Sequence, residues 1–221
     1  MSRWLVTGIF LLLAVSTGTG VVESWADMLG DATARSFAVA AYSTLKLGVV
    51  LAFSFFVFVR EPARRPSRDP VAFVACATAI AAVVALRTPS EDANTAAVVG
   101  GDLVTLASCL WLLAAVLALG RCFGVLPEAR GLVTHGPYRV VRHPVYLGEI
   151  GAAAGLVVAA PETWNLGVLV AFVVAQAIRM RLEERALSAS FPDYAEYAAR
   201  TPRLVPRLPF FSPPVVTGDN P

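Results

Sequence analysis

The chain has 221 residues, of which 57% are hydrophobic and only 15% are charged. Soluble domains usually carry about 25% charged residues, so this deficit indicates that lipid surrounds much of the fold. The formal net charge is only +2 and no long basic stripe is present, which argues against nucleic-acid binding. The three cysteines are widely spaced and lack C-x-x-C spacing, which argues against a metal site or a disulfide framework.

Long apolar runs predict an all-α integral membrane protein with about six transmembrane helices. The run at 36–59 is the clearest, because 24 residues at about 1.5 Å each exceed the ~30 Å hydrocarbon core. The first run competes with a signal peptide, but no small-residue cleavage pattern follows it, so we expect a retained helix. The six runs are residues 4–22, 36–59, 71–86, 103–120, 145–160 and 164–178.

Along the chain, connectors rich in arginine alternate with connectors that are biased towards acidic residues. The connectors at 60–69 and 121–144 each carry four Arg, whereas those at 23–35, 87–102 and 161–163 are biased towards acids. Cytoplasmic connectors of membrane proteins are enriched in Lys and Arg. The pattern therefore predicts a multi-pass topology with both termini and the 121–144 connector on the cytoplasmic face.

Residues 136–149 hold the densest group of polar and aromatic side chains in the chain. Proline lacks an N–H and restricts the residue before it, so His143 should adopt an extended or turn conformation and a helix should begin at Pro144. Such a helix start suits a carboxylate or phosphate. Tyr146 and Glu149 should face the same way, and Gly148 should allow a neighbouring helix or ligand to approach closely.

A second polar cluster spans residues 179–184, after the next apolar run. Gln176, Arg179 and Glu183 share one helix face, with Arg179 and Glu183 spaced for an ion pair, while Glu184 is rotated by about 100°. The short connector at 161–163 predicts an antiparallel hairpin that returns this cluster to the first motif. The alternative is that these acids only anchor a helix end at the membrane interface.

Three separated blocks of the sequence resemble the isoprenylcysteine carboxyl methyltransferase family, whose wider group includes the phospholipid N-methyltransferases. The resemblance covers about residues 119–208, which divides the chain into a helical packing region at 1–118, a catalytic half at 119–208 and a tail at 209–221 expected to be disordered. The blocks are Gly120-Arg121-x-Phe123 with Leu132 to Gly148; Glu183-Glu184-x-x-Leu187-x-x-x-Phe191-x-x-Tyr194-x-x-Tyr197; and Pro202-Arg203-x-x-Pro206.

The resemblance implies an integral-membrane enzyme that binds S-adenosyl-L-methionine between the R-H-P-x-Y segment and the E-E helix. The carboxylate of this cofactor suits a cation or a cluster of N–H groups, its ammonium and sulfonium suit carboxylates and aromatic rings, and its ribose diol suits a Glu. A carboxylate or thiolate acceptor needs no strong base, whereas an amine or hydroxyl acceptor would need one, with Glu149 and His143 as catalytic candidates. The candidate cofactor-binding residues are Tyr138, Arg139, Arg142, His143, Pro144, Tyr146, Gly148, Arg179, Glu183 and Glu184.

The sequence does not identify the methyl acceptor or the oligomeric state. We rank a lipid or isoprenoid that enters from the bilayer at the cytoplasmic face first, and a small thiol second. One alternative is a membrane NADPH-dependent sterol-type reductase, which shares an H-P-x-Y-x-G-like segment but typically has Asn where this chain has Val145. Another is a non-enzymatic membrane protein that retains the fold.

Overall fold

The computed structural model describes residues 3–64, 67, 69–90 and 93–206; the tail expected at 209–221 lies outside them. The described part is helical and contains no strand. Its elements are α1 (Arg3–Gly30), α2 (Ala34–Val59), α3 (Pro70–Ala85), α4 (Thr95–Leu119), the 3₁₀ turns η1 (Gly120–Cys122) and η2 (Gly136–Arg139), α5 (Pro144–Ala159), α6 (Thr163–Ser188) and α7 (Tyr194–Arg200).

Three of the described helical stretches are long and apolar enough to cross a membrane: Val39–Val59, Thr95–Cys122 and Thr163–Ser188. Helices α3 and α5 are also apolar but have only 16 residues each. At 1.5 Å per residue they reach about 24 Å, which is less than the ~30 Å hydrocarbon core.

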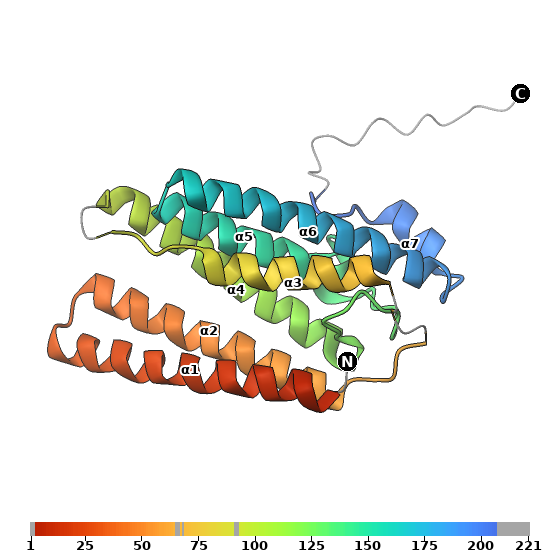
Figure 1. Ribbon diagram of the computed structural model, residues 1–221, viewed down its shortest axis with the longest axis horizontal. Coiled ribbons are helices and arrows are strands. Elements are labelled where there is room, and N and C mark those ends of the chain that lie inside the picture. Colours follow the sequence, from red (N-terminus) through yellow and green to blue (C-terminus); the bar gives the residue numbers. More distant parts are fainter. Residues whose placement is uncertain (1–2, 65–66, 68, 91–92, 207–221) are drawn as a thin grey trace, which may run out of the picture.

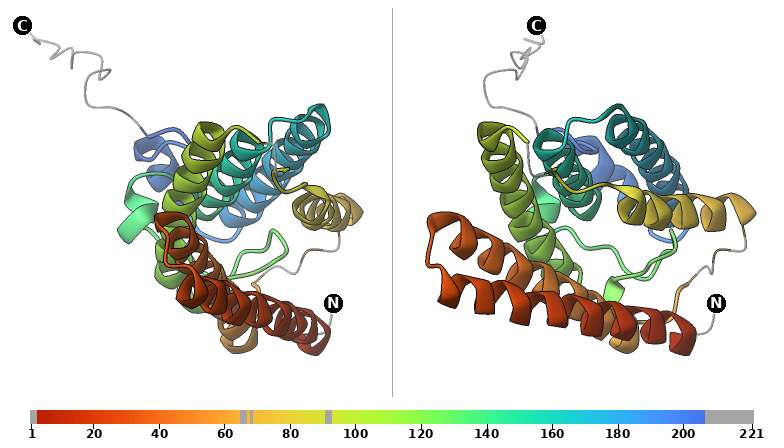
Figure 2. Two further views of the ribbon diagram at one scale, coloured as in Figure 1. Left: turned by 90° about the vertical axis from the view of Figure 1, so that its left-hand side faces the viewer. Right: turned by 60° about the vertical axis from the view of Figure 1, so that its left-hand side comes forward.

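The helices pack side by side with their connectors at two ends (Figure 1). Helix α1 packs on α2, α2 reaches the remainder through α4 and η1, and α4 packs along α5. On the other side α3 packs on α6, and α6 also contacts α5. Figure 2 shows the α1–α2 pair along one side of the molecule, with α3, α5 and α6 on the other.

Two apolar clusters hold these helices together. The first joins α2 to α4 and the residue after η1, where the rings of Phe53 and Phe123 lie 4.7 Å apart. The second joins α3, α5 and α6 around the buried ring of Phe172. Its other buried members are alanines, so these helix backbones approach closely.

Small residues also set the contact between α4 and α5. A Cβ on Gly148 would lie 2.7 Å from the Cβ of Leu112, and one on Gly155 would lie 2.7 Å from the carbonyl oxygen of Gly101. Both distances are shorter than real carbon contacts allow, so glycine is required for this packing. The close approach of a neighbouring helix expected at Gly148 is confirmed, and the neighbour is α4.

The helix boundaries differ from the predicted ones in two places. Helix α1 continues to Gly30, well beyond the apolar run at 4–22. The connector predicted at 87–102 was wrong in its second half, because α4 begins at Thr95: the Asn94 side chain caps it by accepting from the N–H groups of Ala96 and Ala97. Helix α6 continues past its apolar run to Ser188, which agrees with the prediction that Arg179, Glu183 and Glu184 lie on this helix.

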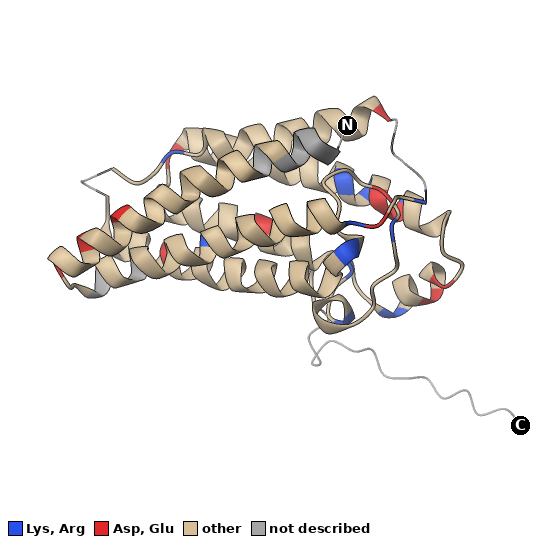
Figure 3. Cartoon of the chain, turned by 90° about the horizontal axis from the view of Figure 1, so that it is seen from below, with Lys and Arg blue, Asp and Glu red and all other residues tan. Residues whose placement is uncertain are grey.

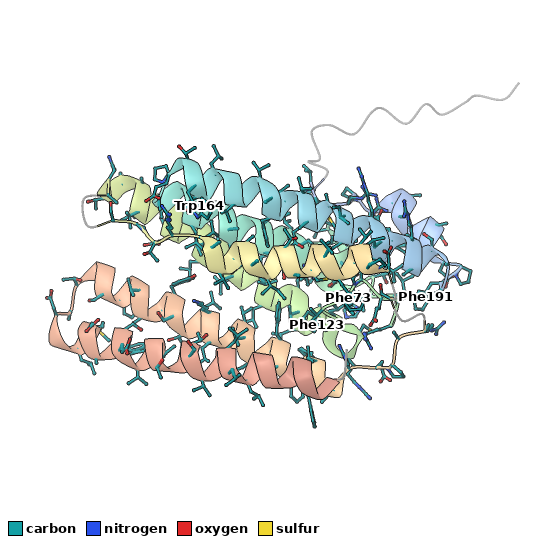
Figure 4. The ribbon with its side chains drawn as sticks, in the orientation of Figure 1. Phe73, Phe123, Trp164 and Phe191 are labelled. Atoms are coloured by element: carbon teal, nitrogen blue, oxygen red, sulfur yellow. The ribbon has the colours of Figure 1, made fainter. Side chains whose placement is uncertain are left out.

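The charged side chains gather at the end of the bundle that holds the connector after α2, the segment around η2, and α7 (Figure 3). There the 60–69 connector is tied to the 121–130 segment: Glu61 N–H donates to the Arg121 carbonyl at 2.8 Å, and Arg64 N–H donates to that of Ala129 at 2.8 Å. The buried Glu128–Arg130 ion pair adds two contacts to the 60–69 connector: Glu128 accepts from the Ser67 N–H, and Arg130 donates to the Glu61 carbonyl. Trp164 lies towards the opposite end from Phe191 (Figure 4).

Candidate active site

The start of α5 organises the polar site. His143 is the N-cap residue, at φ −125° and ψ 62°, and Pro144 opens the helix, which confirms the predicted start. The chain around Pro202 runs against this turn, because the N–H groups of Arg142 and His143 donate to the carbonyls of Pro202 and Arg203 at 2.8 and 3.2 Å. The backbone of the R-H-P segment is therefore fixed from the C-terminal side.

Glu184 of α6 lies at the centre of a cationic group. Its Oε1 atom lies 3.0 Å from His143 Nε2 and 3.2 Å from an Arg142 terminal nitrogen. Arg203 contributes two further hydrogen bonds to this carboxylate, one from Nε at 3.0 Å. These bonds raise the pKa of the Arg203 guanidinium. Glu184 thus joins α6, the start of α5 and the segment after α7.

Glu183, the neighbouring carboxylate, points to a different partner. It accepts a 2.8 Å hydrogen bond from the Tyr146 hydroxyl one turn into α5. The Tyr146 ring is buried and lies 5.5 Å from the His143 ring. The predicted divergence of the two acids on α6 is confirmed, and each acid reaches its own residue of the R-H-P-x-Y motif.

A third carboxylate, Glu149, lies one turn further along α5. It accepts from the Gln176 side-chain amide and lies 3.6 Å from an Arg179 terminal nitrogen. Gln176 is fully buried and also accepts from Arg179 at 2.6 Å. The Arg179 guanidinium lies 4.9 Å from the centre of the Tyr146 ring and donates to the Val125 carbonyl at 3.0 Å.

The i+4 ion pair expected between Arg179 and Glu183 was wrong. Among the described residues, the carboxylate that Arg179 approaches within ion-pair distance is Glu149. The physical reason is that Glu183 accepts a hydrogen bond from the Tyr146 hydroxyl instead. The Arg179 guanidinium donates to Gln176 and lies beside Glu149. Sequence spacing on α6 alone could not weigh a partner on α5.

Two tyrosines of α7 form hydrogen bonds with the segment that precedes α5. The Tyr197 hydroxyl donates to the Tyr138 carbonyl at 2.7 Å, and the Tyr194 hydroxyl lies 3.5 Å from Arg142. Tyr138 is buried, which raises the pKa of its phenol and keeps it neutral. Helix α7 therefore stabilises the turn that carries the motif.

Two donors of the site have no partner among the described groups. The Nε atoms of Arg142 and Arg179 are buried and unbonded. Buried N–H groups normally find an acceptor, and an unmade bond at such a group costs about 1–3 kcal/mol. Together with the half-buried acids Glu183 and Glu184, these donors fit a ligand that has both a carboxylate and cationic centres.

The structure brings together most of the residues predicted for the site, with three exceptions in placement. Arg139 is exposed and takes no part in the network described above. Gly148 faces α4, and Tyr138 lies beneath the turn as support. The residues that meet in the network are Arg142, His143, Tyr146, Glu149, Arg179, Glu183 and Glu184, with Pro144 opening the helix.

Sequence reasoning missed Gln176 and Arg203 as members of the site. Gln176 is recognisable on the helix face of Arg179, and a buried amide on an apolar helix is a signal for a polar partner. Arg203 lies in one of the three blocks that carry the family resemblance, but its distance from the motif along the chain conceals the contact with Glu184.

The fold and the site define an all-helical protein with membrane-length helices and a polar site at one end of its bundle. Residues 92–193 match the model of the family described as phospholipid methyltransferase. The match supports a membrane methyltransferase, and it contains every member of the network except Arg203.

Two curated relatives match parts of the chain. One is the cobalt-zinc-cadmium resistance protein CzcN of Cupriavidus metallidurans, 40% identical over 84 residues, which are 36% of this chain and 38% of the relative. The other is the nickel-cobalt-cadmium resistance protein NccN of Alcaligenes xylosoxydans xylosoxydans, 36% identical over 110 residues, 49% of this chain and 48% of the relative. The chain spans less than half the length of both relatives.

Proposed function

We propose that the chain is an integral-membrane S-adenosyl-L-methionine-dependent methyltransferase that acts on a lipidic or isoprenoid acceptor at the cytoplasmic membrane face. The observation that carries the proposal is the meeting of Glu183 and Glu184 with Tyr146 and His143 at the start of α5. The match of this segment to a methyltransferase family supports it.

The residues present fit the cofactor by the chemistry of their donors and acceptors. The unbonded Nε atoms of Arg142 and Arg179 suit a carboxylate, and the acids Glu183 and Glu184 suit an ammonium, a sulfonium or a ribose diol. When bound, the cofactor supplies a methyl group on an already activated carbon. The chain's own contribution is then to orient the two reactants and exclude water.

His143 and Glu149 are the residues that could hold a proton taken from an amine or hydroxyl acceptor. Both are engaged here: the Nε2 atom of His143 lies 3.0 Å from Glu184, and Glu149 is held by Gln176 and Arg179. A carboxylate or thiolate acceptor would leave both in this orienting role. Glu149 in particular would then fix Arg179 against the Tyr146 ring.

The proposal includes six membrane crossings and an α5–α6 hairpin that forms the cofactor site. Its support is geometric: the connectors after α2 and α4 and the segment after α6 lie at one end, and those after α1, α3 and α5 lie at the other (Figure 1). The four-arginine connectors are at the first end, as the positive-inside rule requires of a cytoplasmic face.

Calorimetry of the purified protein with S-adenosylhomocysteine and, separately, with NADPH tests the proposal. Binding of S-adenosylhomocysteine, with no binding of NADPH, is the expected result. NADPH binding would establish the reductase alternative, and binding of neither would favour the non-enzymatic one. Methyl transfer from labelled cofactor into a membrane lipid extract then identifies the acceptor class.

The names of the relatives add a role in metal resistance as a second candidate. In that role the chain would modify a membrane component rather than hold the metal, since no group of three His, Cys, Asp or Glu in the described ranges could bind an ion. Growth of a host expressing the chain under cobalt, zinc or cadmium tests this. If the Glu184→Gln variant still confers metal tolerance, the role in metal resistance does not depend on methyl transfer.

A further inference from the structure

Near the end of α6, a basic hollow with a volume of about 590 Å³ borders the polar site at Glu184 and Arg203. It is open to the outside, and its residues belong to the C-terminal end of α6 and the segment after α7. The residues that line this basic hollow are Arg181, Glu184, Arg185, Ser188, Ala189 and Arg203.

The basic hollow carries positive charge that the protein does not neutralise. Arg181 and Arg185 are exposed and lie four residues apart on one helix face, a spacing at which like charges repel. In the described residues neither of them forms an ion pair. Glu184, the acid in its wall, is already held by Arg142, His143 and Arg203.

An exposed apolar stripe of α6 leads directly into the basic hollow. Leu166, Val170 and Val174 are 55%, 57% and 53% exposed, and they face away from the neighbouring helices. Arg181 follows Val174 by seven residues and Arg185 follows it by eleven, so both arginines continue the same face. Along the helix, an apolar surface ends in two unpaired cations and a serine hydroxyl.

We propose that the basic hollow binds the phosphate of an anionic membrane lipid whose acyl chains lie along the α6 stripe. Two guanidinium groups and the Ser188 hydroxyl offer charge-assisted hydrogen bonds to phosphate oxygens. The stripe supplies the apolar contact that distinguishes a lipid from free phosphate. Arg181, Arg185 and Ser188 are not among the cofactor contacts proposed above, so the proposal does not depend on the proposed function.

Native mass spectrometry of the full chain in detergent, titrated with dioleoylphosphatidylglycerol, tests the proposal. Each arginine near a membrane surface attracts anionic lipid by ~1 kcal/mol, so Arg181→Gln/Arg185→Gln should weaken binding on the order of 10- to 30-fold. Arg200→Gln is the matched control: it removes an exposed arginine at the same end that pairs with Glu196 outside the basic hollow, and binding should stay within about twofold.

Three further arms complete the test. Arg181→Lys/Arg185→Lys should retain most of the binding, because Lys and Arg near a membrane surface attract anionic lipid to a similar extent. Dioleoylphosphatidylcholine should bind at least about tenfold more weakly, because its headgroup carries no net charge. Inorganic phosphate at millimolar concentration should fail to displace the lipid. Equal binding by the double Gln variant, equal binding of the choline lipid, or displacement by phosphate would each overturn the proposal.

Discussion

The Nε2 atom of His143 lies 3.0 Å from Oε1 of Glu184, although 41 residues separate the two in the sequence. The contact exists because α5 and α6 are joined by a short connector and return to the same end of the bundle. It places the only buried histidine of the described chain beside an acid that two arginines also hold. The pair is the point at which the two sequence motifs meet.

Replacing Glu183 and Glu184 separately by Gln distinguishes the roles of the two acids. We expect Glu184→Gln to lower S-adenosylhomocysteine affinity by about 2–4 kcal/mol, the cost of truncating a buried charged contact. It should also lower the melting temperature, since Arg142 and Arg203 lose their carboxylate. Glu183→Gln should lower affinity less and leave melting nearly unchanged, because its partner is the neutral Tyr146 hydroxyl.

Calorimetry and thermal unfolding of the same preparations measure both effects. The matched control is Glu196→Gln, which removes an exposed acid from α7. If both substitutions at 183 and 184 leave affinity within about twofold of the unchanged protein, the cofactor site lies elsewhere.

Tyr146→Phe removes one hydroxyl from the candidate site. The hydroxyl donates to Glu183 and so orients a carboxylate that we propose contacts the cofactor; we expect affinity for S-adenosylhomocysteine to fall about tenfold, or ~1.4 kcal/mol. The ring stays against the Arg179 guanidinium, and the fold should be retained. Tyr42→Phe on α2, away from the network, is the control, and an equal loss there would mean that the effect is general.

Much of this arrangement was predictable from local sequence rules, and the failures share a cause. The start of α5 at Pro144 and the divergence of Glu183 and Glu184 follow from proline chemistry and helix geometry. The start of α4 did not follow from hydropathy, because the glycines and Asp102 before its apolar run resemble a loop until Asn94 is recognised as a cap. Competition between partners on different helices has no local signature.

The two residues missed in the site illustrate this limit. Gln176 bridges Glu149 and Arg179 only because α5 and α6 lie face to face, and Arg203 reaches Glu184 only because the chain turns back after α7. Sequence spacing within α6 favoured Glu183 as the partner of Arg179, whereas the neighbouring helix supplies Glu149 instead.

The contact between α4 and α5 predicts a sharp difference among glycines. Gly148→Ala places a methyl group against Leu112 and should destabilise the fold by about 1–3 kcal/mol, a loss of several degrees in melting temperature for a chain of this size. Gly167→Ala is the matched control, because a Cβ added there would meet no atom within 4 Å. Equal melting of the two variants would show that the helices do not pack this closely.

Membrane topology can be tested with single cysteines placed at exposed connector positions. With the three native cysteines replaced by serine, we expect His135→Cys and Asp193→Cys to react with an impermeant maleimide from the cytoplasmic side, and Glu162→Cys from the opposite side. This outcome requires that both α5 and α6 cross the membrane. Reaction of all three from one side would mean that the α5–α6 pair enters and leaves by the same face.

The position of α1 and α2 has a consequence for how such a protein can change. Among the described residues, the side chains of the polar network come from 142–203, and α2 meets the remainder of the bundle through α4 and η1. The outward faces of the first two helices can therefore vary without disturbing that network, whereas the inner face of α2 packs in the cluster that holds Val125, an acceptor of Arg179. We expect proteins that share this site to differ mainly in the outward faces of α1 and α2, each fitting them to a different membrane substrate.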